Sequence, residues 1–329
     1  MFDVFTIGSA VRDIFARSND VIYKKGSEFP AGEGACFSLD SKLTLDEVNF
    51  YVGGGAVNTA TTFANQGFKV APIMTVGNDP EGEYIKKVCA KAKLSLDFVS
   101  TDKNHSTSFS FIFSLPSGAR TIFRYQGASW FLKPSTIPWS KLNAKWLYVN
   151  HLAGESHDIL PRLLKTAKKS GMKIAWNPGS TQFERRQEVV PLLAYADVCI
   201  VNQEEAALLT GIPYTKQGAI FRKLDELVRG FVIMTKGPDG VEVSDGKMIW
   251  SAGILPMDKI VDRTGAGDAF GSGFIAALMR KPDDIEHAIQ FASANATGVL
   301  TQWGAMNGLL KKRDELFKWG KLEIRKTSL

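Results

Sequence analysis

Short apolar runs of strand length alternate with amphipathic stretches of helical length along most of this chain. The apolar runs are nearly continuous and rich in β-branched residues, which is typical of strands buried on both faces. The predicted strands are residues 3–7, 70–76, 146–150, 173–176, 198–202 and 231–235, and the predicted helices are 56–66, 81–93, 158–170 and 219–228. Because strands and helices alternate in this way, we expect an α/β fold with a mostly parallel central sheet and helices on both faces.

Two stretches interrupt this alternation and predict a smaller sheet. Residues 14–51 contain strand-like pieces at 21–23 and 48–52 around a glycine-rich centre. Residues 107–125 have the pattern of a hairpin whose turn holds Pro116, Ser117 and Gly118. We expect one domain over residues 1–329, in which segments at about 14–52 and 105–127 form a β-sheet lid. Such a lid would cover the carboxyl edge of the parallel strands, where open α/β sheets bind ligands.

The predicted hairpin has two distinct faces, because side chains alternate along a strand. Phe109, Phe111 and Phe113 share one face of the first strand, and we expect them to pack within the lid. Arg120 and Arg124 share one face of the second strand. Since arginine binds carboxylate or phosphate through two parallel N–H donors, these two residues are also candidates for contact with an anionic substrate group.

The composition is that of a globular protein. Of the 329 residues, 44% are hydrophobic and 22% are charged, which excludes collagen-like, disordered and disulfide-scaffold classes. No run approaches the roughly 20 apolar residues that a membrane-spanning helix needs, and residues 1–13 lack the basic region and cleavage site of a signal peptide. Three widely spaced cysteines suit a reducing compartment. We therefore expect a cytoplasmic protein without a membrane partner.

Most of the net positive charge lies at the C-terminal end. The formal net charge is +6, and residues 311–329 contain seven Lys or Arg and three Asp or Glu, so seven minus three gives +4 of it. We expect a basic terminal helix with a solvated charged face and no nucleic-acid partner. The alternative is nucleic-acid binding through this segment, which would appear as salt-sensitive DNA binding.

A glycine-rich turn followed by a helical pattern is the clearest chemical signal. It has the sequence Thr264-Gly-Ala-Gly-Asp268. Small residues let backbone N–H groups converge at the positive end of a helix, which suits an anion such as a phosphoryl group. Asp268, in the first helical turn, is placed to accept a proton from a hydroxyl beside that anion. The chain has neither GxxxxGK[ST] nor GxGxxG, so P-loop and Rossmann nucleotide sites lose support.

Two motifs together resemble a known family. Asp262-Arg-Thr-Gly-Ala-Gly-Asp268 resembles the C-terminal signature of the ribokinase-like (PfkB) carbohydrate kinases, and Gly53-Gly-Gly-Ala-Val-Asn-Thr-Ala60 resembles their N-terminal glycine motif. Family landmarks occur in the expected order from Gly8 to Gly304. The resemblance implies a ribokinase-like fold and an ATP-dependent phosphotransferase, a carbohydrate kinase that phosphorylates a hydroxyl of a sugar or sugar-like substrate.

The C-terminal signature implies the catalytic centre. By resemblance, Asp268 corresponds to the catalytic base, and the backbone of Gly265, Ala266 and Gly267 would form the anion hole that stabilises the transferred phosphoryl group. Asp262 corresponds to a residue near a monovalent cation site. Arg263 stands where family members often have Thr, which leaves the anion hole intact and leaves activation by K⁺ open.

Asp13 and the glycine motif imply the substrate site. Asp13 follows the first predicted strand, where a family aspartate bonds sugar hydroxyls, although an isolated Asp there is usually a turn or cap residue. Asn58 adds an amide, and a carboxylate with an amide suits paired hydroxyls because each hydroxyl donates and accepts. Gly53 and Gly54 would let the backbone approach the sugar closely.

The resemblance also implies a site for ATP and Mg²⁺. The implied ATP-binding residues are Asn202, Thr235, Gly237, Gly240 and Asn295, and the implied Mg²⁺ residue, acting through water, is Glu205. Each motif has a structural alternative. The Asn202–Glu205 pair would equally be an N-capped helix with an exposed acid, the glycine turn a plain connection between strands, and Asn295 a site of close helix packing.

The substrate and the partners stay open at this point. Val11 and Gly55 stand where ribokinase has an Asn and a Lys, and residues 149–152 lack its substrate-binding Glu. Nucleosides, ketohexoses and sugar acids are therefore alternatives to ribose, and a nucleoside kinase or a non-catalytic nucleotide or sugar sensor are alternatives in function. Pairing of two lids through their edge strands would give a homodimer. The four histidines lack metal-ligand spacing, which favours surface or core roles.

Overall fold

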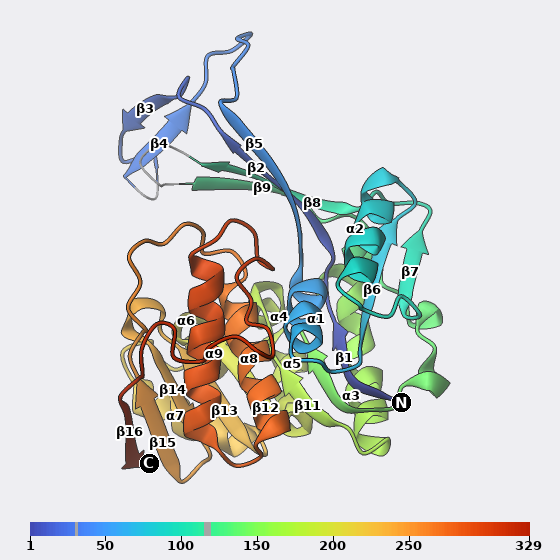
Figure 1. Cartoon of the computed structure of the whole chain (residues 1–329), viewed down its shortest axis with the longest axis vertical. Coiled ribbons are helices and arrows are strands. Elements are labelled where there is room, and N and C mark those ends of the chain that lie inside the picture. The colour runs from blue at the N-terminus through green and yellow to red at the C-terminus, as the bar shows by residue number, and fades with distance from the viewer. Residues whose placement is uncertain (30–31, 115–119) are drawn as a thin grey trace.

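The chain forms a large body of sheet and helices, with a smaller sheet projecting from one end of it (Figure 1). The structure is a computed structural model that describes residues 1–29, 32–114 and 120–329. The predicted turn residues Pro116, Ser117 and Gly118 lie outside the described residues.

The large sheet is mostly parallel, as predicted. Its strand order is β16-β15-β14-β13-β12-β11-β10-β1-β6-β7. The bounds are β1 Phe2–Ile7, β6 Val70–Gly77, β7 Val99–Asp102, β10 Ala144–Val149, β11 Lys173–Trp176, β12 Val198–Asn202, β13 Phe231–Thr235, β14 Val241–Ser244, β15 Met248–Ala252 and β16 Ile324–Ser328. Strands from β7 across to β13 pair in parallel, and β14, β15 and β16 follow antiparallel. The six predicted strands all belong to this sheet.

Helices cover both faces of the large sheet. Their bounds are α1 Gly55–Asn65, α2 Pro80–Lys91, α3 Leu160–Lys169, α4 Ser180–Glu184, α5 Arg186–Val189, α6 Gln203–Thr210, α7 Gln217–Leu227, α8 Ala266–Arg280 and α9 Ile285–Leu300. Consecutive residues of a strand point to opposite faces. Val4 and Tyr148 therefore enter the core shared with α1, α8 and α9, whereas Phe5 and Leu147 enter a second core shared with α3 and α7.

The smaller sheet is built from two separate segments of the chain. Its order is β5-β2-β8-β9, with bounds β2 Val11–Arg17, β5 Glu47–Gly53, β8 Ser108–Ser114 and β9 Arg120–Tyr125. A two-stranded hairpin of β3 Ile22–Lys25 and β4 Glu33–Cys36 lies at its far end (Figure 1). These segments are those that the sequence predicts as a lid, and we refer to β2, β5, β8 and β9 as the lid.

The two faces of the lid differ in chemistry. Asp13, Ser110 and Arg124 are neighbours across β2, β8 and β9, so they share one face. Phe111 and Phe123 pair on the opposite face, with ring centroids 6.2 Å apart. The predicted phenylalanine stripe packs only in part, because Phe113 is buried whereas Phe109 is 40% exposed on the outer face.

Residues 311–329 form turns and an edge strand, so the predicted basic terminal helix is wrong. Trp319 and Leu322 pack against the core, and Gly320 between them has a left-handed φ of 94°. The last residues then pair with β15 as the edge strand β16. Apolar anchors on both sides of a left-handed glycine are incompatible with a continuous helix.

Two expectations from composition can be compared with the structure. Among the residues that the structure describes, no helix has both the length and the apolar character needed to span a bilayer. Cys89 and Cys199 are buried thiols, and burial raises the pKa of each to about 12. These two cysteines are therefore unreactive packing residues, as their spacing suggests.

Candidate active site

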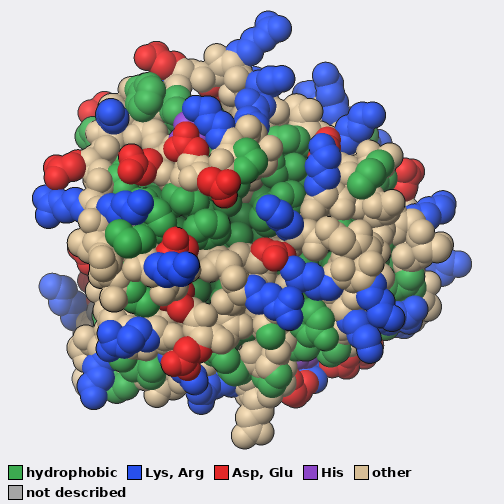
Figure 2. All heavy atoms as spheres, turned by 90° about the horizontal axis from the view of Figure 1, so that it is seen from below, with side chains coloured by type: hydrophobic (Ala, Val, Ile, Leu, Met, Phe, Trp, Pro, Cys, Tyr) green, Lys and Arg blue, Asp and Glu red, His purple; other side chains and the backbone are tan. Residues whose placement is uncertain are grey.

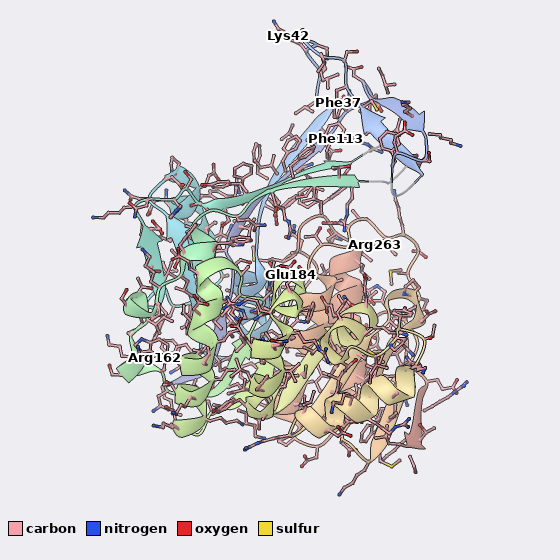
Figure 3. All side chains as sticks on the ribbon, turned by 180° about the vertical axis from the view of Figure 1, so that it is seen from behind. Phe37, Lys42, Phe113, Arg162, Glu184 and Arg263 are labelled. Carbon is pink, nitrogen blue, oxygen red and sulfur yellow. The ribbon has the colours of Figure 1, made fainter. Side chains whose placement is uncertain are left out.

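A cavity of about 260 Å³ lies between the lid and the carboxyl edge of the parallel strands. The lid contributes Asp13, Ser110 and Arg124 to its walls, and the body contributes Asn58 and Asp268. Figure 3 shows the lid, which carries the labelled Phe113, extending above the body. Open α/β sheets bind ligands at this edge, and the predicted base and substrate residues meet here. The cavity is the candidate active site.

Asp268 lies in the first turn of α8 and is partly buried. Asn58 of α1 donates a hydrogen bond from Nδ2 to Asp268 Oδ2 at 2.8 Å. Burial raises the pKa of the Asp268 carboxyl above its usual value, and the bond from Asn58 partly opposes that rise. A desolvated carboxylate beside a cavity accepts a proton more readily than one in water. The geometry therefore brings together two residues that are far apart in sequence and that the motifs singled out.

The turn before α8 has the form of an anion-binding site. Gly265 caps the helix with a left-handed φ of 79°, and a side chain there would collide with Ala305. A side chain built on Gly267 would meet nothing within 4 Å, so open space borders the helix start. The first N–H groups of a helix lack intrahelical partners and carry its positive end. The backbone of Gly265, Ala266 and Gly267 is thus suited to an anion.

Asp13 lies inside strand β2, not after the first strand as predicted. Strand alternation turns its neighbour Arg12 outward, where Arg12 pairs with Glu81 at 2.8 Å and lies 3.9 Å over the ring of Tyr84. Asp13 itself is 4% exposed. Burial and the nearby charge of Asp262 raise the pKa of Asp13 to about 7. Because Arg12 points to the outer face and pairs with Glu81, the two consecutive charged residues Arg12 and Asp13 both fit within strand β2.

The glycine motif lies directly against Asp13. A side chain on Gly53 would collide with the Asp13 carboxylate, and one on Gly54 would collide with the backbone of Ser9. Gly54 also has a left-handed φ of 96° at the N-terminus of α1. These glycines bring β5 and α1 close to the cavity, so that Asn58 reaches Asp268 while Asp13 stays in the opposite wall.

Asp262 is bound by an arginine from the lid. Arg120 Nη1 lies 2.6 Å from Asp262 Oδ1, and the same oxygen accepts hydrogen bonds from Thr264 N at 3.0 Å and Thr264 Oγ1 at 2.8 Å. Asp262 Oδ2 is buried without a partner among the described residues. The sequence predicts a monovalent cation near Asp262, whereas in the structure a guanidinium group provides the positive charge there.

Asn202 and Thr235 end adjacent strands at the same edge of the sheet as the cavity. Asn202 Oδ1 accepts a hydrogen bond from Glu205 N, and Asn202 N donates one to Glu205 Oε2, both at 2.8 Å. This reciprocal capping box matches the structural alternative for the pair. Gly237 and Gly240 have φ of 57° and 88° in the turn between β13 and β14. None of these five residues lines the cavity.

Asn295, a residue of α9, is fully buried where that helix packs against α8, as its structural alternative expects. Its Nδ2 donates to Ala269 O at 2.8 Å, and its Oδ1 accepts from Leu310 N at 2.8 Å. Both polar ends of the amide are therefore occupied within the protein. Asn295 thus joins the two helices to the chain that follows them, and its assignment to the ATP site stays a prediction.

His151 and Arg124 are the site residues that sequence reasoning underrated. Both line the cavity, and His151 Nε2 lies 2.6 Å from Thr181 Oγ1. Burial, with the charge of Arg124 nearby, lowers the pKa of His151 to about 4, so the ring is neutral at pH 7. The signal that could have identified His151 is its position just after β10, at the carboxyl edge of a parallel strand.

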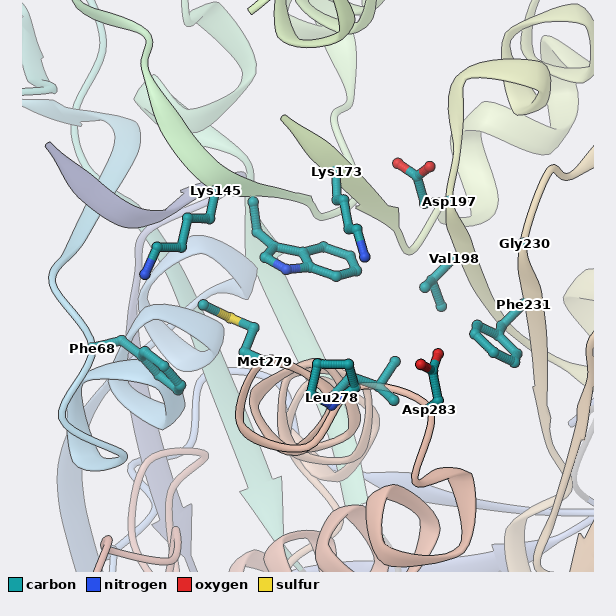
Figure 4. A pocket seen from close by; sticks show the side chains of 12 residues that line it. Phe68, Lys145, Lys173, Asp197, Val198, Gly230, Phe231, Leu278, Met279 and Asp283 are labelled. Carbon is teal, nitrogen blue, oxygen red and sulfur yellow. The ribbon is translucent and has the colours of Figure 1, made fainter. Parts of the chain in front are cut away.

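A second cavity, of about 330 Å³, lies at the other end of the strands (Figure 4). It is lined by Trp146, Lys145 and Lys173 near the starts of β10 and β11, and by Leu278 and Met279 near the end of α8. Seen from below, the molecule carries intermixed positive and negative side chains around an apolar area (Figure 2). Because the second cavity contains neither Asp268 nor the glycine turns, its larger size does not make it the active site.

Comparison with known proteins agrees with these motifs. The family model of the pfkB family carbohydrate kinases matches residues 1–312. A ribokinase of Haemophilus influenzae is 28% identical over 289 residues, covering 83% of this chain and 89% of that protein. An ATP-dependent ribose-1-phosphate kinase of Halopiger xanaduensis is 28% identical, covering 76% and 79%. A nucleoside kinase of Methanothermobacter thermautotrophicus is 24% identical, covering 78% and 81%.

Solved structures share the fold. An Arabidopsis thaliana ribokinase complexed with ribose and ATP superposes with a TM-score of 0.77 at 21% identity, covering 95% of this chain and 96% of that one. A putative ribokinase II of E. coli in complex with ATP and Mg²⁺ gives a TM-score of 0.79 at 20% identity, covering 95% and 97%. The predicted ribokinase-like fold is confirmed. With the family model matching nearly the whole chain, this protein belongs to the pfkB family of carbohydrate kinases.

Proposed function

We propose that this kinase transfers the γ-phosphoryl group of ATP to a hydroxyl of a sugar or nucleoside, with Asp268 as the catalytic base. The observation that carries the proposal is a partly buried carboxylate at the start of α8, held by Asn58 in the wall of a cavity. A base and an anion-binding helix start at the same point are the two elements that phosphoryl transfer to an alcohol requires.

The substrate is held between the lid and the body. Asp13 and Asn58 bind its hydroxyls, and Asn58 Oδ1, buried without a partner among the described residues, is free to accept from one of them. Asp268 takes the proton of the reacting hydroxyl while the oxygen of that hydroxyl forms a bond to the γ-phosphorus. The bond from that phosphorus to the β,γ-bridging oxygen breaks, and ADP leaves. The N–H groups of Gly265 to Gly267 stabilise the charge that develops on the phosphoryl oxygens.

ATP would lie along the carboxyl edge of the sheet, with its phosphates at the start of α8 and the rest of the nucleotide toward the end of β13. Asn202, Thr235, Gly237 and Gly240 are the proposed nucleotide contacts, because they end adjacent strands or form the turn that follows. The open space beside Gly267 leaves room for the phosphates next to the anion hole.

Members of the pfkB family use ATP with Mg²⁺ in general, and the residues here fit a loosely held ion. In the described parts of the chain, no group of three or more His, Cys, Asp or Glu side chains could hold a metal. Glu205 is partly buried and commits Oε2 to the capping box, which leaves Oε1 to reach the ion through water. Mg²⁺ usually takes few protein ligands and many phosphate and water oxygens, and it neutralises phosphate charge when bound.

The lid has two further proposed roles. Its closure over the substrate would exclude water and so suppress ATP hydrolysis.

The outer face of the lid exposes Phe50 and Phe123, each by 53%, and we include a homodimer through this face in the proposal. Light scattering after size exclusion tests it: Phe123→Glu should give a monomer, and Tyr214→Glu, at an exposed aromatic outside the lid, should leave the dimer intact. A wild-type monomer would contradict the dimer.

The kinase proposal is tested by measuring ADP formation with a panel of sugars and nucleosides. We expect ADP release to depend on one class of acceptor, with a phosphorylated product detectable by ³¹P NMR. ATP and acceptor that bind without any ADP release would instead support the alternative of a non-catalytic nucleotide or sugar sensor.

A further inference from the structure

Arg124 is a charged residue of the cavity that the proposed chemistry does not use. It lies on β9, on the lid face that carries Asp13 and Ser110, and it lines the same cavity as Asp268. Arg120, two residues earlier on the same face, is bonded to Asp262. Arg124, by contrast, makes no ion pair or side-chain hydrogen bond with any residue that the structure describes. The cavity therefore holds one guanidinium group without a counter-ion in the described chain.

The other charged groups around the cavity do not neutralise Arg124. The carboxylates of Asp13 and Asp268 lie in the same cavity but beyond ion-pair distance of it. The charged groups that influence the pKa of Asp13 are Asp262 and Arg12. Arg124 instead lies close enough to His151 to lower the pKa of that ring. His151 is neutral at pH 7 and so does not add to the positive charge. Arg124 and the two carboxylates therefore mark different parts of the wall.

The part of the wall near Arg124 is rich in uncharged donors. Thr181 Oγ1 is 2.6 Å from His151 Nε2, and Ser180 and Gln126 line the same cavity. A guanidinium group offers paired N–H donors that match the two oxygens of a carboxylate or phosphate, and hydroxyls and amides complete such a site. The other polar residues of the cavity, Asp13 of the lid with Asn58 and Asp268 of the body, are suited to hydroxyl groups.

We propose that the substrate is an alcohol that also carries an anionic oxygen group, a phosphate or a carboxylate, and that Arg124 binds this group. This inference rests on the proposed function and names the substrate class of the same site. The reacting hydroxyl would lie at Asp268 while the anion lies under β9. Because Arg124 belongs to the lid, its bond to the substrate would also draw the lid onto the body.

Matched pairs of acceptors test the inference on the full chain. The pairs are fructose with fructose 6-phosphate, ribose with ribose 5-phosphate, and sorbitol with gluconate, and adenosine and cytidine serve as neutral nucleosides. We expect the anionic member of at least one pair to exceed its neutral partner by about 100-fold in kcat/KM, since charged hydrogen bonds contribute about this much. The phosphate and carboxylate pairs then distinguish the two kinds of anion.

Variants assign the preference to Arg124. Arg124→Met should lower kcat/KM for the preferred anionic substrate by about 100-fold, mainly through KM, and leave neutral acceptors unchanged. Arg124→Lys should recover part of the loss, because it keeps the charge without the planar fork. Lys25→Met, at an exposed cation of β3, is the control and should match wild type.

A binding measurement separates this inference from the kinase assignment. The same acceptors are titrated calorimetrically into wild type and Arg124→Met without ATP. Tight binding of an anionic acceptor that is lost in Arg124→Met supports the inference even if no acceptor is phosphorylated, and that combination would overturn the kinase proposal alone. Neutral acceptors that bind best, with affinities that Arg124→Met leaves unchanged, would overturn the inference and leave the kinase proposal standing.

Discussion

Arg120 Nη1 lies 2.6 Å from Asp262 Oδ1, so the lid strand β9 is tied to the loop that opens the anion-binding turn. The two residues are 142 positions apart in sequence. Asp262 is buried, and Arg120 is also 3.3 Å from Thr264 Oγ1, next to Gly265. The position of the lid and the shape of the turn before α8 are therefore mechanically linked.

Breaking this tie should impair turnover more than folding. We expect Arg120→Gln to lower kcat/KM by about tenfold, because misplacement of a turn beside the reacting phosphoryl group costs at least that much. Arg17→Gln, at an exposed lid arginine, is the matched control. Steady-state kinetics of both variants, with and without KCl, would check this. Wild-type kinetics in Arg120→Gln would show that the tie has no role, and strong K⁺ activation of the wild type would show that a cation still reaches Asp262.

Asp13 predicts a pH dependence of substrate binding. Burial raises the pKa of Asp13 to about 7, so its carboxyl is protonated in the folded protein below that pH and ionised above it. If the ionised form accepts substrate hydroxyls, KM should fall as pH rises through about 7. A KM profile that is flat between pH 6 and pH 8 would contradict this role.

The same shift has a consequence for stability. The pKa of Asp13 is higher in the folded than in the unfolded chain. The free energy of unfolding of the protein therefore falls as pH rises from about 4 to about 7, because the unfolded chain releases the proton first. Asp13→Asn should therefore raise the urea midpoint more at pH 8 than at pH 4. Asp20→Asn, at an exposed position between β2 and β3, should show no such difference between the two pH values.

Asn295 should matter for stability and not for ATP. Removing its amide leaves Leu310 N unpaired in the core and removes the bond to Ala269 O, so Asn295→Ala should lower the free energy of unfolding by about 2–4 kcal/mol. KM for ATP should stay within about twofold of wild type, whereas Thr235→Ala should raise it if the β13 turn binds the nucleotide. A large rise in KM for ATP in a fully folded Asn295→Ala protein would instead support the assignment of Asn295 to the ATP site.

The body of the fold was predictable because burial on both faces leaves a simple pattern. β6 is buried along its whole length, and its apolar run reads directly as a strand. Strand β2 was not predictable, because Arg12 and Asp13 interrupt its apolar residues, and the partner of Arg12, Glu81, is distant in sequence. The C-terminal segment failed for a similar reason, since charge density suggested a helix while two anchors and one edge strand decide its shape.

Within the site, residues adjacent in a motif were predictable and residues brought together by folding were not. Asp268 and Asn58 come from two glycine-rich motifs, so the resemblance singles out both residues, whereas the hydrogen bond between them is seen only in the structure. The side chains of Arg124 and His151 line one cavity only because the lid folds over the end of β10. The packing role of Asn295 was not distinguishable from a ligand-binding role, because a buried amide and a ligand-binding amide look alike in sequence until their partners are known.

The role of Asp268 is tested most directly by the turnover of Asp268→Asn with saturating ATP and acceptor. The amide keeps the size of the side chain and a hydrogen bond with Asn58 but cannot accept the proton, so kcat should fall by about 10³-fold or more while ATP binding and the urea midpoint change little. Asp258→Asn, at an exposed aspartate just before the signature, should retain wild-type kcat. A folded Asp268→Asn protein with near-wild-type kcat would contradict the account.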